Sequence, residues 1–205
     1  MSDHSIAVHK HRDDVGSRMG MWLFLFTELL LFGGLFLVYA VYRHEYISQF
    51  RVAAMELNTT VGALNTIILL TSSLTVALSI AALQKGNRIL SILLLVMTNI
   101  LALSFMINKY FEWSSKIHHG IYPGSEHLLE LSNGQVIFYG LYYIMTGLHG
   151  LHVIIGVIFL SIVLGFIITG SVNKDNYVKL ENAGLYWHLV DLIWIFLFPL
   201  FYLIQ

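Results

Sequence analysis

Five long stretches of apolar residues constrain the fold of this chain more than any other feature. They cover residues 19–42, 57–83, 89–108, 136–169 and 183–204, and none contains lysine or arginine. A helix needs about 20 mostly apolar residues to cross roughly 30 Å of hydrocarbon. Backbone groups in lipid must find their hydrogen-bond partners within the segment, which excludes open sheets. The sequence therefore predicts an all-α membrane protein, a bundle of five transmembrane helices.

The composition agrees with a membrane protein. Hydrophobic residues make up 57% of the 205 residues and charged residues 11%, whereas a soluble domain has about 25% charged residues. The net charge of −1 argues against a nucleic-acid partner, and the lack of cysteine excludes disulfides and thiolate metal sites. The first apolar stretch is longer than that of a cleavable signal. We expect a polar tail over residues 1–18 and a single transmembrane domain over 19–205.

Lysine and arginine are distributed unevenly between the two ends of the predicted bundle. Seven lie on the side of the N-terminus, namely Lys10, Arg12, Arg18, Lys85, Arg88, Lys174 and Lys179. Four lie on the other side, namely Arg43, Arg51, Lys109 and Lys116. An excess of lysine and arginine marks the cytoplasmic side. We therefore expect a cytoplasmic N-terminus and a periplasmic C-terminus, in a bacterial inner membrane.

Glu28 is one of two acidic residues within the five stretches; the other is Asp191. Counting about 1.5 Å of helix rise per residue from Met19 places Glu28 near the middle of the bilayer. A buried carboxylate is costly, so Glu28 should either be neutral or find a hydrogen-bond donor. Two roles stay open: a site that handles protons or couples helices, and a neutral acid that only hydrogen-bonds to a neighbouring helix.

Two pairs of polar residues occur with a spacing of three, His149 with His152 and His188 with Asp191. Each pair shares one helix face. Histidine is a common metal ligand, but a metal site would need further ligands and a second shell. We favour hydrogen bonding between the fourth and fifth helices, with His188 and Asp191 as a local pair. The histidines outside the five stretches match no ligand spacing, so no metal site is predicted.

The second apolar stretch carries a polar stripe. Asn65, Ser72, Thr75 and Ser79 fall on one face of a helix over this range. Small hydroxyl residues allow helices to pack closely and to form hydrogen bonds with each other. We expect the stripe to face another helix; a polar pore lining is the alternative.

Five short motifs follow one another along the chain. They are GMWLFLFTE at 20–28, LNT at 64–66 with LLTSS at 69–73, YFE at 110–112, TGLHGLHVIIG at 146–156 and YWHLVDLIW at 186–194. Each lies on a predicted helix or at its end. Together they resemble the signatures of cytochrome c oxidase subunit III, and the resemblance covers residues 17–205.

The resemblance implies a role that residue spacing does not show. Subunit III of these oxidases binds no haem or copper, which belong to the catalytic subunit I of a complex that also contains subunit II. Subunit III packs on that subunit, holds phospholipid, and supports proton uptake and lasting activity. No catalytic residue or cofactor is then expected in this chain, and Glu28 matches the family's intramembrane glutamate. The resemblance also implies that five further residues are structural or lie near lipid, and that they are not metal ligands. They are Glu112, His149, His152, His188 and Asp191.

The chain is expected to depart from the family pattern in its number of helices. Many family members have seven helices, whereas this chain is expected to have five and to lack the first pair. In longer members that pair forms one wall of a lipid-filled cleft, which here would be open, absent or closed by another subunit. Five-helix members also occur in quinol oxidases and beside nitric oxide reductases, so neither the electron donor nor the acceptor of the complex follows.

Two other classes of function are alternatives to this interpretation. A small membrane cytochrome would use His149 or His152 with His188 as haem ligands from facing helices. A transporter or channel would use Glu28 as its ion site. The odd number of helices and the lack of an internal repeat weaken the transporter interpretation.

Overall fold

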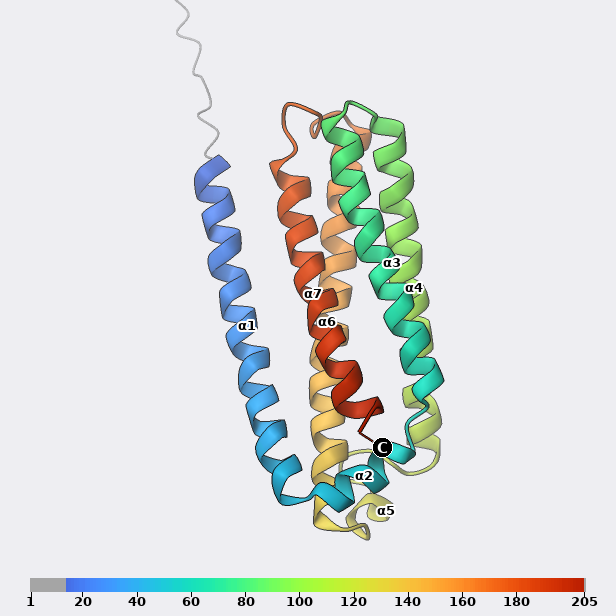
Figure 1. Cartoon of the computed structure of the whole chain (residues 1–205). Helices are drawn as coiled ribbons and strands as arrows, with labels where there is room; N and C mark the ends of the chain where they lie inside the picture. Colours follow the sequence, from blue (N-terminus) through green and yellow to red (C-terminus); the bar gives the residue numbers. More distant parts are fainter. Residues whose placement is uncertain (1–13, 205) are drawn as a thin grey trace, which may run out of the picture.

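The computed structural model describes residues 14–204, which form seven helices and no named strand (Figure 1). The helices are α1 (Asp14–Glu45), α2 (Ile47–Met55), α3 (Thr59–Gln84), α4 (Arg88–His118), α5 (Glu126–Leu129), α6 (Asn133–Ile168) and α7 (Val178–Tyr202). Five of them, all except α2 and α5, are long and apolar enough to cross a membrane, which confirms the predicted number. Of the expected tail, residues 1–13 lie outside the described residues, and the chain is helical from Asp14 onward.

Four of the long helices form a bundle, and the fifth lies against its side. Helix α3 contacts α4 and α7, and α6 contacts α4 and α7, so these four close a ring of neighbours. Helix α1 packs along α6 and α7 at the edge of this ring (Figure 1). Its buried residues are Leu25, Phe32 and Tyr39, which recur every seven residues and form one narrow stripe. Most of the surface of α1 therefore faces away from the protein.

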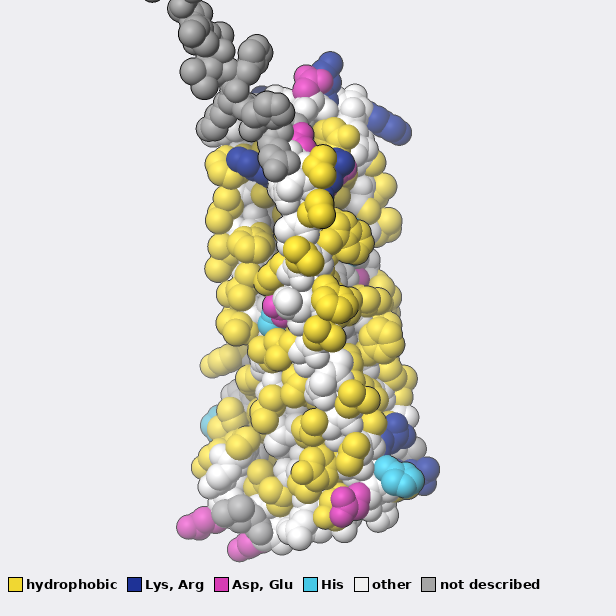
Figure 2. All heavy atoms as spheres, turned by 90° about the vertical axis from the view of Figure 1, so that its left-hand side faces the viewer, with side chains coloured by type: hydrophobic (Ala, Val, Ile, Leu, Met, Phe, Trp, Pro, Cys, Tyr) yellow, Lys and Arg dark blue, Asp and Glu magenta, His cyan; other side chains and the backbone are white. Residues whose placement is uncertain are grey.

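The charged side chains lie mainly at the two ends of the molecule. Figure 2 shows the α1 side, where a broad apolar band separates the charged groups of one end from those of the other. Exposed apolar residues are normal where lipid is the solvent, because their transfer from water into hydrocarbon is favourable. The surface thus has the pattern expected of a bundle that spans a membrane.

Local signals in the sequence begin and end these helices. The Asn58 side chain accepts hydrogen bonds from two backbone N–H groups at the start of α3, and the Asn87 side chain does the same for Leu90 N at the start of α4. Between these helices Gly86 adopts a φ of 80°, a left-handed conformation that glycine enters without steric cost. Its N–H bonds to Leu83 O, and the next N–H reaches Ala82 O. This glycine turn lets α4 fold back tightly against α3.

The polar stripe of the second predicted helix faces other helices, as the sequence predicts: Ser72 accepts a hydrogen bond from Nε1 of Trp187 on α7, and the other three residues face α4. Three side-chain pairs join α3 and α4: Asn65 with Asn108 at 2.8 Å, Thr75 with Thr98 at 2.8 Å, and Ser79 with Ser91 at 2.9 Å. A hydroxyl buried in lipid or in an apolar core costs free energy unless it is paired. The pairing therefore fixes the contact between α3 and α4 and leaves no polar lining of a pore on this face.

Candidate functional site

The first candidate site is an acid–histidine pair halfway along α1. Oε2 of Glu28 lies 2.8 Å from Nε2 of His152 on α6, and both side chains are largely buried. Phe32, one turn further along α1, meets the His152 ring edge-on at 5.3 Å. The acid that was expected to need a partner thus has one on a neighbouring helix, and the pair joins α1 to the four-helix bundle.

The hydrogen-bond geometry determines how many protons this pair holds. Nδ1 of His152 lies 2.7 Å from the carbonyl oxygen of Leu148, which can only accept, so Nδ1 carries a proton. The contact between Nε2 and Glu28 then contains a single proton, which sits either on the carboxyl group or on the imidazole. In both cases the pair has no net charge.

The second candidate site surrounds Glu112, near the end of α4. Its carboxylate accepts hydrogen bonds from the hydroxyls of Tyr142 on α6, at 2.6 Å, and Tyr202 on α7, at 2.5 Å. Nζ of Lys109 lies 3.1 Å from the second oxygen of Glu112 and donates to the same two tyrosines. Each ionic group is surrounded by partners, as a buried ion pair requires. The cluster ties together α4, α6 and α7.

Sequence reasoning did not foresee this cluster. The apolar stretch ends at residue 108, so Lys109 was assigned to a connection outside the membrane; in the structure α4 continues through His118. The helix continues because Lys109 is buried against aromatic residues that the sequence alone does not place beside it: its Nζ lies 5.5 Å from the Trp194 ring and 5.1 Å from the Tyr142 ring. The available signals were the spacing of three between Lys109 and Glu112 and the YFE motif at 110–112, which includes Glu112.

The other histidines of the spans have separate environments. His149 is fully buried between Phe105, at 5.7 Å between ring centres, and Trp194, at 5.2 Å, and neither ring nitrogen has a hydrogen-bond partner among the residues from 14 to 204. Nδ1 of His188 lies 2.6 Å from the hydroxyl of Ser73 on α3. The three intramembrane histidines therefore do not converge, and within residues 14–204 no group of three or more His, Cys, Asp or Glu side chains is placed to hold a metal ion.

The sequence predicts polar contacts between the fourth and fifth long helices. One runs from the Tyr186 hydroxyl to the carbonyl oxygen of His152, at 3.2 Å. His188 and Asp191 turn instead toward α3, where both interact with Ser73. The predicted hydrogen bonding between the fourth and fifth long helices is therefore present at Tyr186, and the local pairing of His188 with Asp191 stays a prediction.

Together the fold and these sites define a multi-pass membrane protein whose helices are held by buried polar pairs. The family model for cytochrome c oxidase subunit III matches residues 2–205, and the chain belongs to this family. Cytochrome c oxidase subunit 3 of Yarrowia lipolytica is 34% identical over 98% of this chain and 71% of its own length. A probable quinol oxidase subunit 3 of Staphylococcus saprophyticus is 30% identical over 92% of this chain and 89% of its own length.

A third relative is a fusion protein. The heme-copper oxidase subunit I+III of Aeropyrum pernix is 30% identical over 91% of this chain, which corresponds to 22% of that much longer protein. Its name joins subunits I and III in one polypeptide. The names of these relatives therefore include two kinds of electron donor, cytochrome c and quinol.

Proposed function

We propose that this chain is the non-catalytic subunit III of a haem-copper terminal oxidase that operates in aerobic respiratory electron transport. It packs on the catalytic subunit I, in a complex with subunit II, and the haem and copper are held by the catalytic partner. The observation that carries this proposal is the match to the family over residues 2–205. The fused relative supports contact between the two subunits, because one polypeptide keeps subunits I and III together.

The placement of the histidines supports a chain without its own catalytic centre. A small cytochrome needs two ligands that face each other across a haem. Here His152 is held by Glu28 and His188 by Ser73, while His149 lies between Phe105 and Trp194. The three side chains serve three different contacts, which disfavours the small-cytochrome alternative.

The Glu28–His152 pair is the group in this chain best suited to support proton uptake by the complex. It holds one proton without net charge, as its hydrogen bonds require. Paired Asp, Glu and His side chains within membrane segments mark proton relays. Glu28 is therefore the proposed proton-handling residue. Separately, bound phospholipid is the proposed ligand of the exposed helix faces.

The distribution of lysine and arginine supports the orientation. The excess at the N-terminal side favours a cytoplasmic N-terminus and a periplasmic C-terminus. The proposed location is the inner membrane of a bacterium. The electron donor is proposed to be either cytochrome c or a quinol, since relatives of both kinds match the chain over more than nine tenths of its length.

Comparison of the complex with and without this chain tests the proposed role. Both forms would be purified from the native host, and oxygen consumption would be followed until activity is lost. We expect similar initial rates per haem and a clearly shorter active lifetime without the chain. Equal lifetimes and equal proton uptake would contradict the supporting role, and loss of the haem itself with this chain would contradict the non-catalytic assignment.

A further inference from the structure

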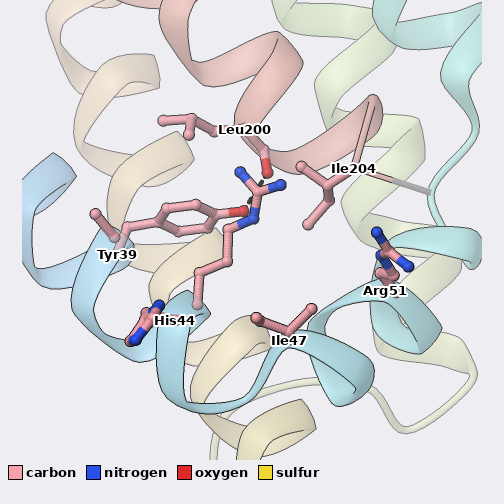
Figure 3. Close-up of a pocket in the computed structure, with 8 residues that line it drawn as sticks. Tyr39, His44, Ile47, Arg51, Leu200 and Ile204 are labelled. Carbon is pink, nitrogen blue, oxygen red and sulfur yellow. Dashed lines mark hydrogen bonds between the residues drawn. The ribbon is translucent and has the colours of Figure 1, made fainter.

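A cavity of about 420 Å³ lies where the end of α1, the short helix α2 and the end of α7 meet (Figure 3). It is separate from both candidate sites described above, since neither Glu28 nor Glu112 lines it. Its wall is formed by Tyr39, Ala40, Arg43, His44, Ile47, Arg51, Leu200 and Ile204. Two arginines and a histidine thus share one cavity with apolar side chains.

The inner wall of this cavity is apolar, and packing contacts and a hydrogen bond hold its side chains in place. Tyr39 is fully buried, and its hydroxyl donates to the carbonyl oxygen of Leu200 (Figure 3). The Tyr39 ring also packs edge-on against Phe50 and Phe201, at 5.5 and 5.1 Å. The tyrosine hydroxyl is therefore already used, and the polar side chains left for a ligand are those of Arg43, His44 and Arg51.

The cavity has positive side chains without an acidic counterpart. Arg43 and Arg51 form no ion pair or hydrogen bond with another residue between 14 and 204. No acidic residue lines the cavity. Two acids near this end are engaged elsewhere, since Glu56 accepts from Tyr139 at 2.6 Å and Glu112 is held by its own cluster. The charge of the cavity therefore favours an anion.

The position of the cavity indicates what kind of anion it takes. It lies at the last turn of α1, where the apolar surface of that helix gives way to charged residues. Leu37 and Val41, on the adjoining turns of α1, are 71% and 64% exposed. Guanidinium groups bind phosphate well through paired N–H donors, and basic pockets between membrane helices bind phospholipid headgroups. A ligand with a phosphate and an adjoining hydrocarbon chain matches both parts of this surface.

We propose that this cavity binds the phosphate group of an anionic phospholipid, with Arg43 and Arg51 as its ligands and the acyl chain along the exposed side of α1. The proposal rests on the lipid-binding part of the proposed function and specifies its site and lipid class. His44 stands at the rim as a further donor.

The test uses the full chain, purified in mild detergent with whatever partners accompany it and stripped of lipid by detergent exchange. The Arg43→Gln/Arg51→Gln variant would be compared with Lys85→Gln/Lys174→Gln, which removes the same charge from exposed positions at the other end. Each would be titrated with dioleoylphosphatidylglycerol, dioleoylphosphatidylcholine and inorganic phosphate, and native mass spectrometry would count bound lipid. The Arg43→Lys/Arg51→Lys variant keeps the charge and controls for folding.

We expect phosphatidylglycerol to bind roughly thirtyfold more weakly to the arginine variant, as two lost cations predict. The Lys85/Lys174 control should bind like the wild type, and the Arg-to-Lys variant should regain part of the affinity. Equal phosphatidylglycerol affinity in the wild type and the arginine variant would overturn the proposal. Inorganic phosphate that binds through both arginines as tightly as the lipid would overturn the lipid assignment in favour of a free-phosphate site.

Failure of this lipid-site proposal can be distinguished from failure of the proposed function. The presence of a haem-copper partner is scored in the same preparation by optical absorption. Arginine-dependent lipid binding without such a partner would leave this inference standing and refute the oxidase assignment. Lipid binding that does not depend on the two arginines, in a preparation that contains a haem-copper partner, would refute this inference and leave the oxidase assignment standing.

Discussion

Lys109 and Glu112 form an ion pair in which Nζ and Oε2 are 3.1 Å apart and about 8% of each side chain is exposed. The hydroxyls of Tyr142 and Tyr202 complete the shell around both charges. The two tyrosines belong to helices that are distant from α4 in the sequence. The ion pair therefore depends on correct assembly of three helices, and it stabilises that assembly in turn.

Removing one member of this ion pair should lower the stability of the protein far more than removing both. The Lys109→Met variant leaves a buried carboxylate without its cation, and we expect a loss of about 3–5 kcal/mol in the free energy of unfolding. The double variant Lys109→Met/Glu112→Leu should lose much less than the sum of the single losses. Unfolding in mixed detergent micelles measures each value, and additive losses would contradict a coupled pair.

Replacing Glu28 by glutamine should separate helix coupling from proton handling. The amide of glutamine can still donate to Nε2 of His152, but it cannot release a proton. We expect the Glu28→Gln complex to assemble normally, with lower proton uptake per electron and faster loss of activity during turnover. The Glu45→Gln variant changes an exposed acid at the end of the same helix and serves as control. Normal turnover, proton stoichiometry and lifetime in Glu28→Gln would refute the proton-handling role.

Gly156 on α6 should tolerate no larger residue. A Cβ atom there would lie 2.7 Å from the Trp187 ring, which is buried and held by a hydrogen bond from its Nε1 to Ser72. We expect Gly156→Ala to destabilise the protein by about 1–3 kcal/mol through overpacking. Gly165→Ala on the same helix meets nothing within 4 Å and should be neutral or slightly stabilising. Thermal unfolding of the two variants side by side checks this, and similar midpoints would contradict the packing at Trp187.

His149 should be replaceable by an apolar ring. Both its nitrogens are buried without a hydrogen-bond partner in the described part of the chain, and apolar replacement of an unpaired polar group is neutral or stabilising. We expect His149→Phe to assemble with unchanged haem content and with stability within about 1 kcal/mol of the wild type. Loss of a haem absorption band in this variant would show instead that His149 is a ligand, and the small-cytochrome alternative would gain support.

Much of the fold follows from the sequence because lipid leaves few choices. Five apolar stretches gave five helices, and the polar stripe with Asn65 and Ser79 was correctly expected to face another helix. Glu28 could be singled out because a carboxylate at that depth needs a partner. These inferences use only properties along one helix.

The partners across helices could not be predicted in the same way. Nothing local indicates that Glu28 meets His152, 124 residues away, or that Tyr202 reaches Glu112. The end of α4 was misplaced because hydropathy falls at Lys109, although tertiary contacts keep that lysine buried. The short helix α2 was missed because its nine residues are held by Phe50 and two alanines packed in the core. In each case a contact between distant segments overrides the local pattern.

Purification of the tagged chain from native membranes in mild detergent tests the central claim most directly. The account predicts that a large catalytic subunit comes with it, carrying haem seen by optical absorption and copper seen by elemental analysis, while this chain itself binds neither. A chain that elutes alone with bound haem, or with partners that contain no haem and copper, would contradict its assignment as an oxidase subunit.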